Sequence, residues 1–203
     1  AWGGRLIAGV TAHYGEANSR IRSLFGNGVL ETNGYGVGAT LSWQGQAGLY
    51  LDGQAQVSWY QSDLESTVLG SLVTGNGGQG EAFSVEAGQR LPLTDKVSIT
   101  PQAQLLYSNV RFDGFADAAD AQVSLDRGES LKSRLGLSVD QHEIWEGGRG
   151  HVYAVANISY EWMDPSRVDV SGTLIEHANE RLWGEVGVGF SATWSPGVTF
   201  FGE

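Results

Sequence analysis

The sequence contains no cysteine, which excludes a disulfide framework and any metal site built on thiolates. A chain without cysteine also suits passage through an oxidising compartment before folding. The longest nearly apolar run lies near 152–160, well short of the roughly 20 residues of a membrane helix. Positive charge is scarce as well, with 12 Lys and Arg against 23 Asp and Glu. Because nucleic-acid binding needs a basic surface, a nucleic-acid partner is not expected.

A regular alternation of apolar and polar residues is the main feature that is present. Segment 51–59 has the sequence LDGQAQVSW, in which apolar residues and glycine hold the odd positions and polar residues the even ones. Successive side chains of a β-strand point to opposite faces of the sheet, so this pattern predicts a strand with one apolar and one polar face. It recurs about nine times, over the approximate spans 5–15, 34–43, 49–61, 81–91, 97–110, 130–141, 151–163, 181–194 and 198–203.

The connections between these runs alternate strictly in length. The short, turn-rich ones are 44–48, 92–96, 142–150 and 195–197, and the long ones are 16–33, 62–80, 111–129 and 164–180. Outer-membrane barrels have short turns on the periplasmic rim and long loops on the extracellular rim. The pattern therefore predicts an all-β, antiparallel up-and-down transmembrane β-barrel, with the short connections in the periplasm and the chain located in the outer membrane of a Gram-negative bacterium.

Three further features favour this barrel over a soluble sandwich or a lipocalin-like barrel. The expected strands are longer than the roughly five or six residues of ordinary strands. Aromatic residues gather near the ends of the runs, as in the two interfacial girdles: Tyr14, Trp43, Trp59, Tyr60, Tyr107, Trp162, Trp183 and Trp194. The polar face carries charged and amide residues that suit a wet lumen. The lumen-facing residues expected are Asp52, Gln54, Gln56, Glu86, Arg90, Gln102, Gln104, Lys132, Arg134, Asp140, Glu161 and Glu185.

The opposite face of the same strands is expected to contact lipid. Its members include Leu51, Val57, Leu105, Leu137, Val139 and Val186.

The order of several short motifs resembles the autotransporter β-domain family of type V secretion. The segments are GQAQV at 53–57, SVEAGQR at 84–90, ITPQAQLLYS at 99–108, LKSRLGL at 131–137 and EVGVGF at 185–190. Each motif alone is weak, but their order and spacing across nearly the whole chain are fairly specific. The resemblance implies a twelve-stranded barrel with a helix threading the lumen. About nine of those strands would be present, so 1–203 is expected to be one domain, a partial barrel incomplete at both ends.

The resemblance also implies a function and partners. The expected function is that of a translocator, which anchors an N-terminal passenger in outer-membrane lipid and exports it to the cell surface. Its partners would be the passenger and linker helix in the lumen, the barrel-assembly machinery and periplasmic chaperones. From the residues alone, a porin-like diffusion channel and an outer-membrane adhesin or enzyme acting through extracellular loops remain open, because fold does not determine function.

No catalytic, cofactor or metal residues are expected, so we do not expect an enzyme. The Gly-x-Gly sequences at 36–38 and 187–189 fall inside predicted strands, where glycine relieves crowding rather than binding a nucleotide. His142 and His151 flank one short connection and could approach each other at one rim. A metal site there is one interpretation, and two solvated histidines are the one we favour.

Overall fold

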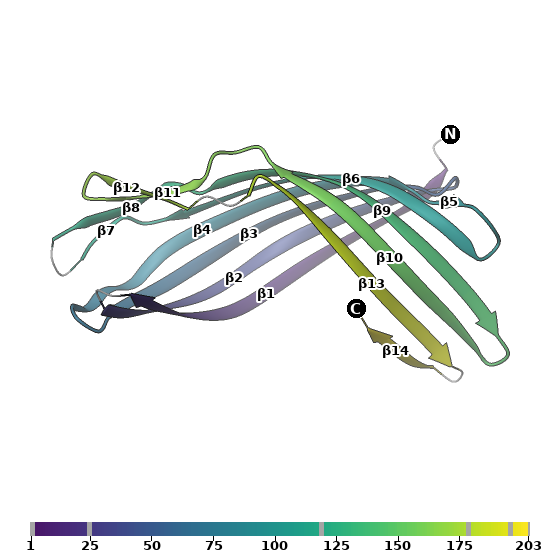
Figure 1. The fold of residues 1–203 in the computed structure, drawn as a ribbon, viewed down its shortest axis with the longest axis horizontal. Helices are drawn as coiled ribbons and strands as arrows, with labels where there is room; N and C mark the ends of the chain where they lie inside the picture. Colours follow the sequence, from purple (N-terminus) through teal and green to yellow (C-terminus); the bar gives the residue numbers. More distant parts are fainter. Residues whose placement is uncertain (1–2, 24–25, 118–119, 178–179, 195–196, 203) are drawn as a thin grey trace.

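The computed structural model describes residues 3–23, 26–117, 120–177, 180–194 and 197–202. Its main feature is a ten-stranded antiparallel sheet in which each long strand pairs with the next one along the chain. Within these described ranges, nine strands follow one another across the sheet, which confirms the predicted number of about nine. Their order is β1(Gly4–Ser23), β2(Gly26–Gly45), β3(Leu49–Ser66), β4(Gly70–Gln89), β6(Val97–Phe112), β9(Glu129–Trp145), β10(Gly148–Glu161), β13(Leu182–Trp194) and the five-residue β14(Val198–Gly202). The two-residue β5(Leu91–Pro92) pairs with the start of β6. Figure 1 shows the sheet twisted and curled into part of a barrel, with β1 and β14 at its two edges.

Two connections form a second, four-stranded sheet of their own. It consists of β7(Phe115–Ala116), β8(Gln122–Arg127), β11(Ser166–Val170) and β12(Thr173–His177). The first two strands lie between β6 and β9, and the last two between β10 and β13. In Figure 1 this small sheet lies at the left, at the same end of the long strands as the β3–β4 turn. Within the described ranges, no helix has the length and apolar character needed to cross a membrane.

The long sheet has one apolar and one polar face, and burial is inverted relative to a water-soluble protein. Among the described residues no hydrophobic side chain is buried, whereas the serines at 58, 62, 98 and 159 are. The apolar face carries exposed large side chains such as Val10 and Val186, each 88% exposed. Water-soluble proteins rarely expose a continuous apolar surface of this kind. Packing among apolar side chains therefore does not hold this sheet together; its backbone ladder and its polar face do.

The two N-terminal long connections are shorter than the sequence analysis expected. Segment 16–33 continues β1 and β2, which pair up to Ser23 and Gly26, and segment 62–80 contains the ends of β3 and β4. The prediction failed because the apolar–polar alternation ends before the strands do. Toward this end of the strands, Glu16, Glu31 and Asp63 lie on the face that is apolar elsewhere. Leu30 and Leu64 pair with each other on the opposite face, so the two faces no longer differ in polarity there.

Aromatic side chains mark the place where the alternation ends. Tyr14, Tyr35 and Trp59 are direct cross-strand neighbours on the apolar face, and the rings of the last two stack at 5.6 Å. At the opposite ends of the strands, Trp145 and Trp194 contact each other edge to face on the same face. Two residues of the expected girdles are placed differently. Tyr60 and Trp183 lie on the polar face, because their strand neighbours Trp59 and Leu182 occupy the apolar one.

Candidate functional site: the polar face of the long sheet

The predicted lining residues lie on one face of the long sheet. The pairing registers place Asp52 opposite Glu86, Glu86 opposite Gln104, and Gln104 opposite Arg134. These four residues thus form one row across four strands, because directly paired residues of an antiparallel sheet share a face. The other lining residues on strands occupy neighbouring rows of the same face: Gln54, Gln56, Gln102, Lys132, Asp140, Glu161 and Glu185. Arg90 follows β4 directly, and its Nε donates to Ser98 Oγ on that face at 2.9 Å.

The middle of the polar face is a half-buried hydrogen-bonded cluster around Glu86. Tyr50 Oη donates to one carboxylate oxygen of Glu86 at 2.8 Å, and Arg134 Nη2 donates to the other. Tyr50 Oη also lies 3.2 Å from Gln102 Oε1. The Arg134 and Glu86 side chains are 30% and 18% exposed, so water screens the pair only partly. The cluster ties β3, β4, β6 and β9 together, four strands that come from well-separated parts of the chain.

Several buried polar atoms of this middle region have no partner among the described residues. They are Asp52 Oδ1, Arg134 Nε and Asn157 Oδ1. Asp52 and Arg134 belong to the row of Glu86, and Asn157 lies opposite Glu185 in an adjacent row. Buried polar groups in native proteins are nearly always hydrogen-bonded to protein or to water. The polar face therefore offers hydrogen bonds to something that lies against it.

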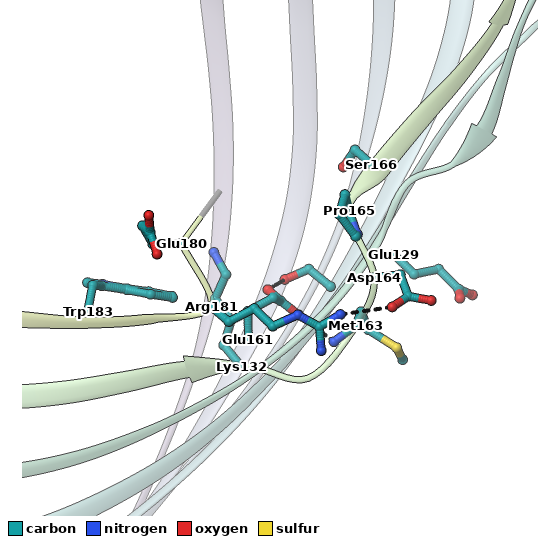
Figure 2. Close-up of a pocket in the computed structure, with 11 residues that line it drawn as sticks. Glu129, Lys132, Glu161, Met163, Asp164, Pro165, Ser166, Glu180, Arg181 and Trp183 are labelled. Atoms are coloured by element: carbon teal, nitrogen blue, oxygen red, sulfur yellow. Dashed lines mark hydrogen bonds and ion pairs between the residues drawn. The ribbon is translucent and has the colours of Figure 1, made fainter. Parts of the chain in front are cut away.

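A pocket lies at one end of the polar face, where β9, β10 and β13 approach the four-stranded sheet. It is lined by Glu129, Ser130, Lys132, Glu161, Met163, Asp164, Pro165, Ser166, Glu180, Arg181 and Trp183. Figure 2 shows Arg181 and Glu161 in the middle of these residues, with Trp183 to one side and Asp164 to the other. Lys132 Nζ lies 5.6 Å from the centre of the Trp183 ring. The predicted lining residues Lys132 and Glu161 are thus part of a mixed-charge pocket.

Charge-assisted hydrogen bonds hold that pocket in shape. The Glu161 carboxylate accepts hydrogen bonds from Ser130 Oγ at 2.6 Å and from the backbone N–H groups of Leu131 and Met163, both at 3.0 Å. Asp164 accepts from Arg127 at 3.1 Å and from Arg181 at 2.9 Å. Hydrogen bonds to Tyr160 and to Asp164 raise the pKa of the Arg181 guanidinium above its usual value, so Arg181 stays protonated. The pocket thereby links the end of β10 to the connections that form the small sheet.

The opposite end of the polar face carries Asp140, His142 and His151. His151 Nε2 lies 2.9 Å from Asp140 Oδ1, while Ser138 Oγ donates to Asp140 Oδ2 at 2.7 Å. The two imidazole rings stack at 4.4 Å between centroids and 5° between planes. The sequence predicts that His142 and His151 can approach each other, but that prediction does not include Asp140. Alternation could have found it, because Asp140 and His142 are two residues apart on β9 and so share a face.

Sequence reasoning missed other members of this face. Tyr50 and Ser84 both lie in the polar rows, and Gln104 Nε2 donates to Ser84 Oγ at 2.9 Å. Tyr50 shares the parity of Asp52, which is the signal that could have revealed it. Glu185 forms a hydrogen bond with Trp183 Nε1 at 3.2 Å on its own strand. Gln54 and Gln56 are exposed on the same face of β3.

Comparison with known proteins relates this chain to a protein family. The family model for the autotransporter beta-domain matches residues 1–203. The adhesin BmaC autotransporter of Brucella suis biovar 1 (strain 1330) is 42% identical over 207 residues, which cover 98% of this chain and 6% of that protein. The pertactin autotransporter of Bordetella parapertussis is 30% identical over 98% of this chain and 22% of that protein. The chain thus spans only a small part of the length of these relatives.

Solved structures have the same fold. The transport unit of the autotransporter AIDA-I from Escherichia coli matches with a TM-score of 0.79 at 16% identity, over 98% of this chain and 73% of that one. The beta domain of the Bordetella autotransporter BrkA matches with a TM-score of 0.62 at 19% identity, over 97% and 82% of the two chains. Both likenesses concern the architecture of the sheet.

Proposed function

The chain belongs to the autotransporter β-domain family, and we propose that its polar face lines the lumen of an outer-membrane barrel that carries a passenger to the cell surface. β-Domains of this family are outer-membrane proteins of Gram-negative bacteria, and this chain is one of them. In this proposal 1–203 form a single domain and a partial barrel. Further strands complete it at β1 and β14, because an open sheet edge in lipid leaves backbone groups unpaired at several kcal/mol each.

The apolar face has the dimensions of a membrane-spanning band. On β2 the stretch from Tyr35 to Trp43 covers about 27 Å of strand, or about 20 Å across the membrane at a barrel tilt of about 40°. That height is close to the apolar band of roughly 25 Å in outer-membrane barrels. Leu51, Leu105, Leu137, Val139 and Val186 are exposed on this face and would contact lipid. Val57 lies on it as well and is half-buried.

The observation that carries the lumen assignment is the set of unpartnered polar atoms in the middle of the polar face. Side chains on the concave side of a curled sheet converge. The Asp52, Glu86 and Arg134 side chains are accordingly half-buried, and they are less exposed than the large side chains of the apolar face. A polypeptide segment in the lumen would accept from Arg134 Nε and donate to Asp52 Oδ1 and Asn157 Oδ1. We propose that this segment is the linker helix that follows the passenger.

The proposal includes partners beyond the lumen. The passenger precedes the β-domain in the same polypeptide, and outer-membrane lipid surrounds the apolar face. Barrel-assembly machinery and periplasmic chaperones would deliver and insert the chain, as expected for a protein with so much exposed apolar surface. The relatives include an adhesin autotransporter and pertactin, and we assign no reaction to this β-domain.

Surface display of a tag tests the proposed function. A short epitope is fused upstream of the complete barrel, in the place of the passenger, and intact cells are stained with an antibody that cannot cross the outer membrane. We expect surface staining that disappears after external protease treatment, while the barrel keeps its heat-modifiable mobility. An assembled barrel whose tag is stained only after the outer membrane is permeabilised would contradict export. That result would favour a porin-like channel or a protein acting through the loops that form the four-stranded sheet.

A further inference from the structure

The end of the polar face opposite the four-stranded sheet holds three potential metal ligands. Asp140, His142 and His151 each offer one ligand atom, and these three atoms all lie within 4.8 Å of one another. All three side chains are half-buried on the polar face, so they are sheltered without being closed off from solvent. They come from the two strands of one tight hairpin, β9 and β10, which turns at Glu146–Gly147.

Strand pairing holds the two histidines close together. His142 and His151 are direct partners in the β9–β10 register. The His142 N–H bonds to Lys96 O on the other side of β9, at 2.8 Å. The His142–His151 pair is therefore a non-hydrogen-bonded pair, the kind in which opposite side chains stand closest. The third ligand lies on the same face because Asp140 precedes His142 by two residues.

The carboxylate and one imidazole are already positioned by neighbours that are not ligands. Ser138 Oγ donates a hydrogen bond to Asp140 Oδ2, while Asp140 Oδ1 lies against His151 Nε2. The Tyr153 ring stacks on the His151 ring, with the ring centroids 5.5 Å apart. Such supporting contacts orient the ligands of metal sites and contribute to their affinity. The pairing register of the hairpin therefore fixes how the three donor side chains are placed relative to one another.

We propose that Asp140, His142 and His151 bind a divalent transition-metal ion of the zinc class, with the fourth position open to solvent. Two imidazole nitrogens and one carboxylate oxygen are a donor set suited to zinc and its neighbours, whereas calcium and magnesium prefer oxygen ligands alone. Tetrahedral zinc holds its donors about 3.3 Å apart, so the side chains rotate slightly from their present spacing. Asp140 Oδ1 exchanges its contact with His151 for the metal, and the ion clamps β9 to β10.

The surrounding charges set the strength of this site. Ser98 is the β6 partner of Asp140, and Arg90 bonds to Ser98, so one cation stands near the site. The single carboxylate of Asp140 offsets only part of a divalent charge. The site is therefore weaker than a closed structural zinc site with four protein ligands. It can be loaded and unloaded in the folded barrel.

Calorimetric titration of the detergent-solubilised full-length protein with zinc chloride tests the site. We expect that Asp140→Asn, His142→Ala and His151→Ala each weaken the tightest binding event by roughly tenfold or more. His13→Ala is the matched control, because His13 also lies on the polar face but contacts Ser58 on a distant strand. It should leave the affinity unchanged. Heat-modifiable mobility shows that each variant is folded.

A second measurement needs no substitution. Diethylpyrocarbonate modifies accessible imidazoles, and the modified positions are read by mass spectrometry in the wild-type protein with and without zinc. Zinc should protect His142 and His151 and leave His13 unaffected. The proposal is overturned if zinc protects neither histidine, or if any of the three ligand variants binds zinc as the wild type does.

Discussion

Tyrosine rings on the polar face lie directly over glycines of the neighbouring strand. A Cβ built on Gly88 would stand 2.5 Å from Cε1 and Oη of Tyr50, and one on Gly189 would stand 2.5 Å from the Tyr153 ring. Both pairs are cross-strand partners, Tyr50 with Gly88 and Tyr153 with Gly189. A ring that covers a glycine shields the backbone ladder there, and the glycine leaves room for the ring to lie flat. For Tyr50, this position is what lets its hydroxyl reach Glu86.

We predict that Gly88→Ala destabilises the barrel by about 1–3 kcal/mol, because the added methyl group pushes Tyr50 away from Glu86 and Gln102. Gly53→Ala is the matched control: it lies mid-strand on the apolar face, and its new Cβ would approach only Leu41 O, at 3.9 Å. Denaturant unfolding in lipid vesicles measures both free energies. Equal losses in the two variants would show that the ring–glycine contact contributes nothing specific.

Along a single strand, the alternation of side chains separates two environments. On β3 the residues Gln56 and Val57 are sequence neighbours, and their pairing partners place them on the polar and apolar faces respectively. A charged side chain facing lipid loses its hydration, whereas one facing a wet lumen keeps it. The two positions share backbone surroundings and depth, so they form a matched pair for testing which face is which.

We predict that Val57→Arg lowers the free energy of unfolding in bilayers by roughly 2–4 kcal/mol, and that Gln56→Arg lowers it far less. The reason is that arginine at mid-strand on the lipid face cannot keep its water. Folding yield and unfolding free energy in vesicles measure the difference. A larger loss for Gln56→Arg would mean that the polar face contacts lipid, contrary to the proposed lumen.

The strands could be predicted from sequence in the middle of their length but not at their ends. Alternation located β3 and β6 because lipid on one side and a polar interior on the other force opposite residue types onto the two faces. Near Glu16 and Asp63 the apolar face carries carboxylates, so the alternation is lost although the strands continue. Counting Tyr60 with Trp59 among the girdle aromatics was wrong for a related geometric reason: adjacent residues of a strand point to opposite faces.

The candidate site was predictable as a face but not as contacts. Each strand's parity identified Glu86 and Arg134 as residues of the polar face. Their ion pair depends on register, which sets how β4, β6 and β9 are shifted along one another. Alternation repeats every two residues and so does not fix that shift. His142 and His151 are the exception, since a tight hairpin determines its own register.

The whole sheet has two chemically different ends, and together they indicate an orientation. At one end β1 to β4 extend beyond the row of Tyr14, Tyr35 and Trp59 with polar residues on both faces, and the four-stranded sheet lies at that end. At the other end the turns 46–48 and 146–147 follow closely on Trp43 and Trp145. Outer-membrane barrels project their longer structures outward and keep short turns in the periplasm. The four-stranded sheet should therefore lie outside the cell.

Single cysteines test this orientation, since this chain has no cysteine of its own. Val68 and Ala47 are exposed residues in the β3–β4 and β2–β3 turns, at opposite ends of β3. We predict that an impermeant thiol reagent labels Val68→Cys on intact cells and leaves Ala47→Cys unlabelled, because the outer membrane separates the reagent from the periplasmic turn. Both should react once the outer membrane is permeabilised, which shows that each thiol is accessible. Labelling of Ala47→Cys alone on intact cells would reverse the orientation and place the four-stranded sheet in the periplasm.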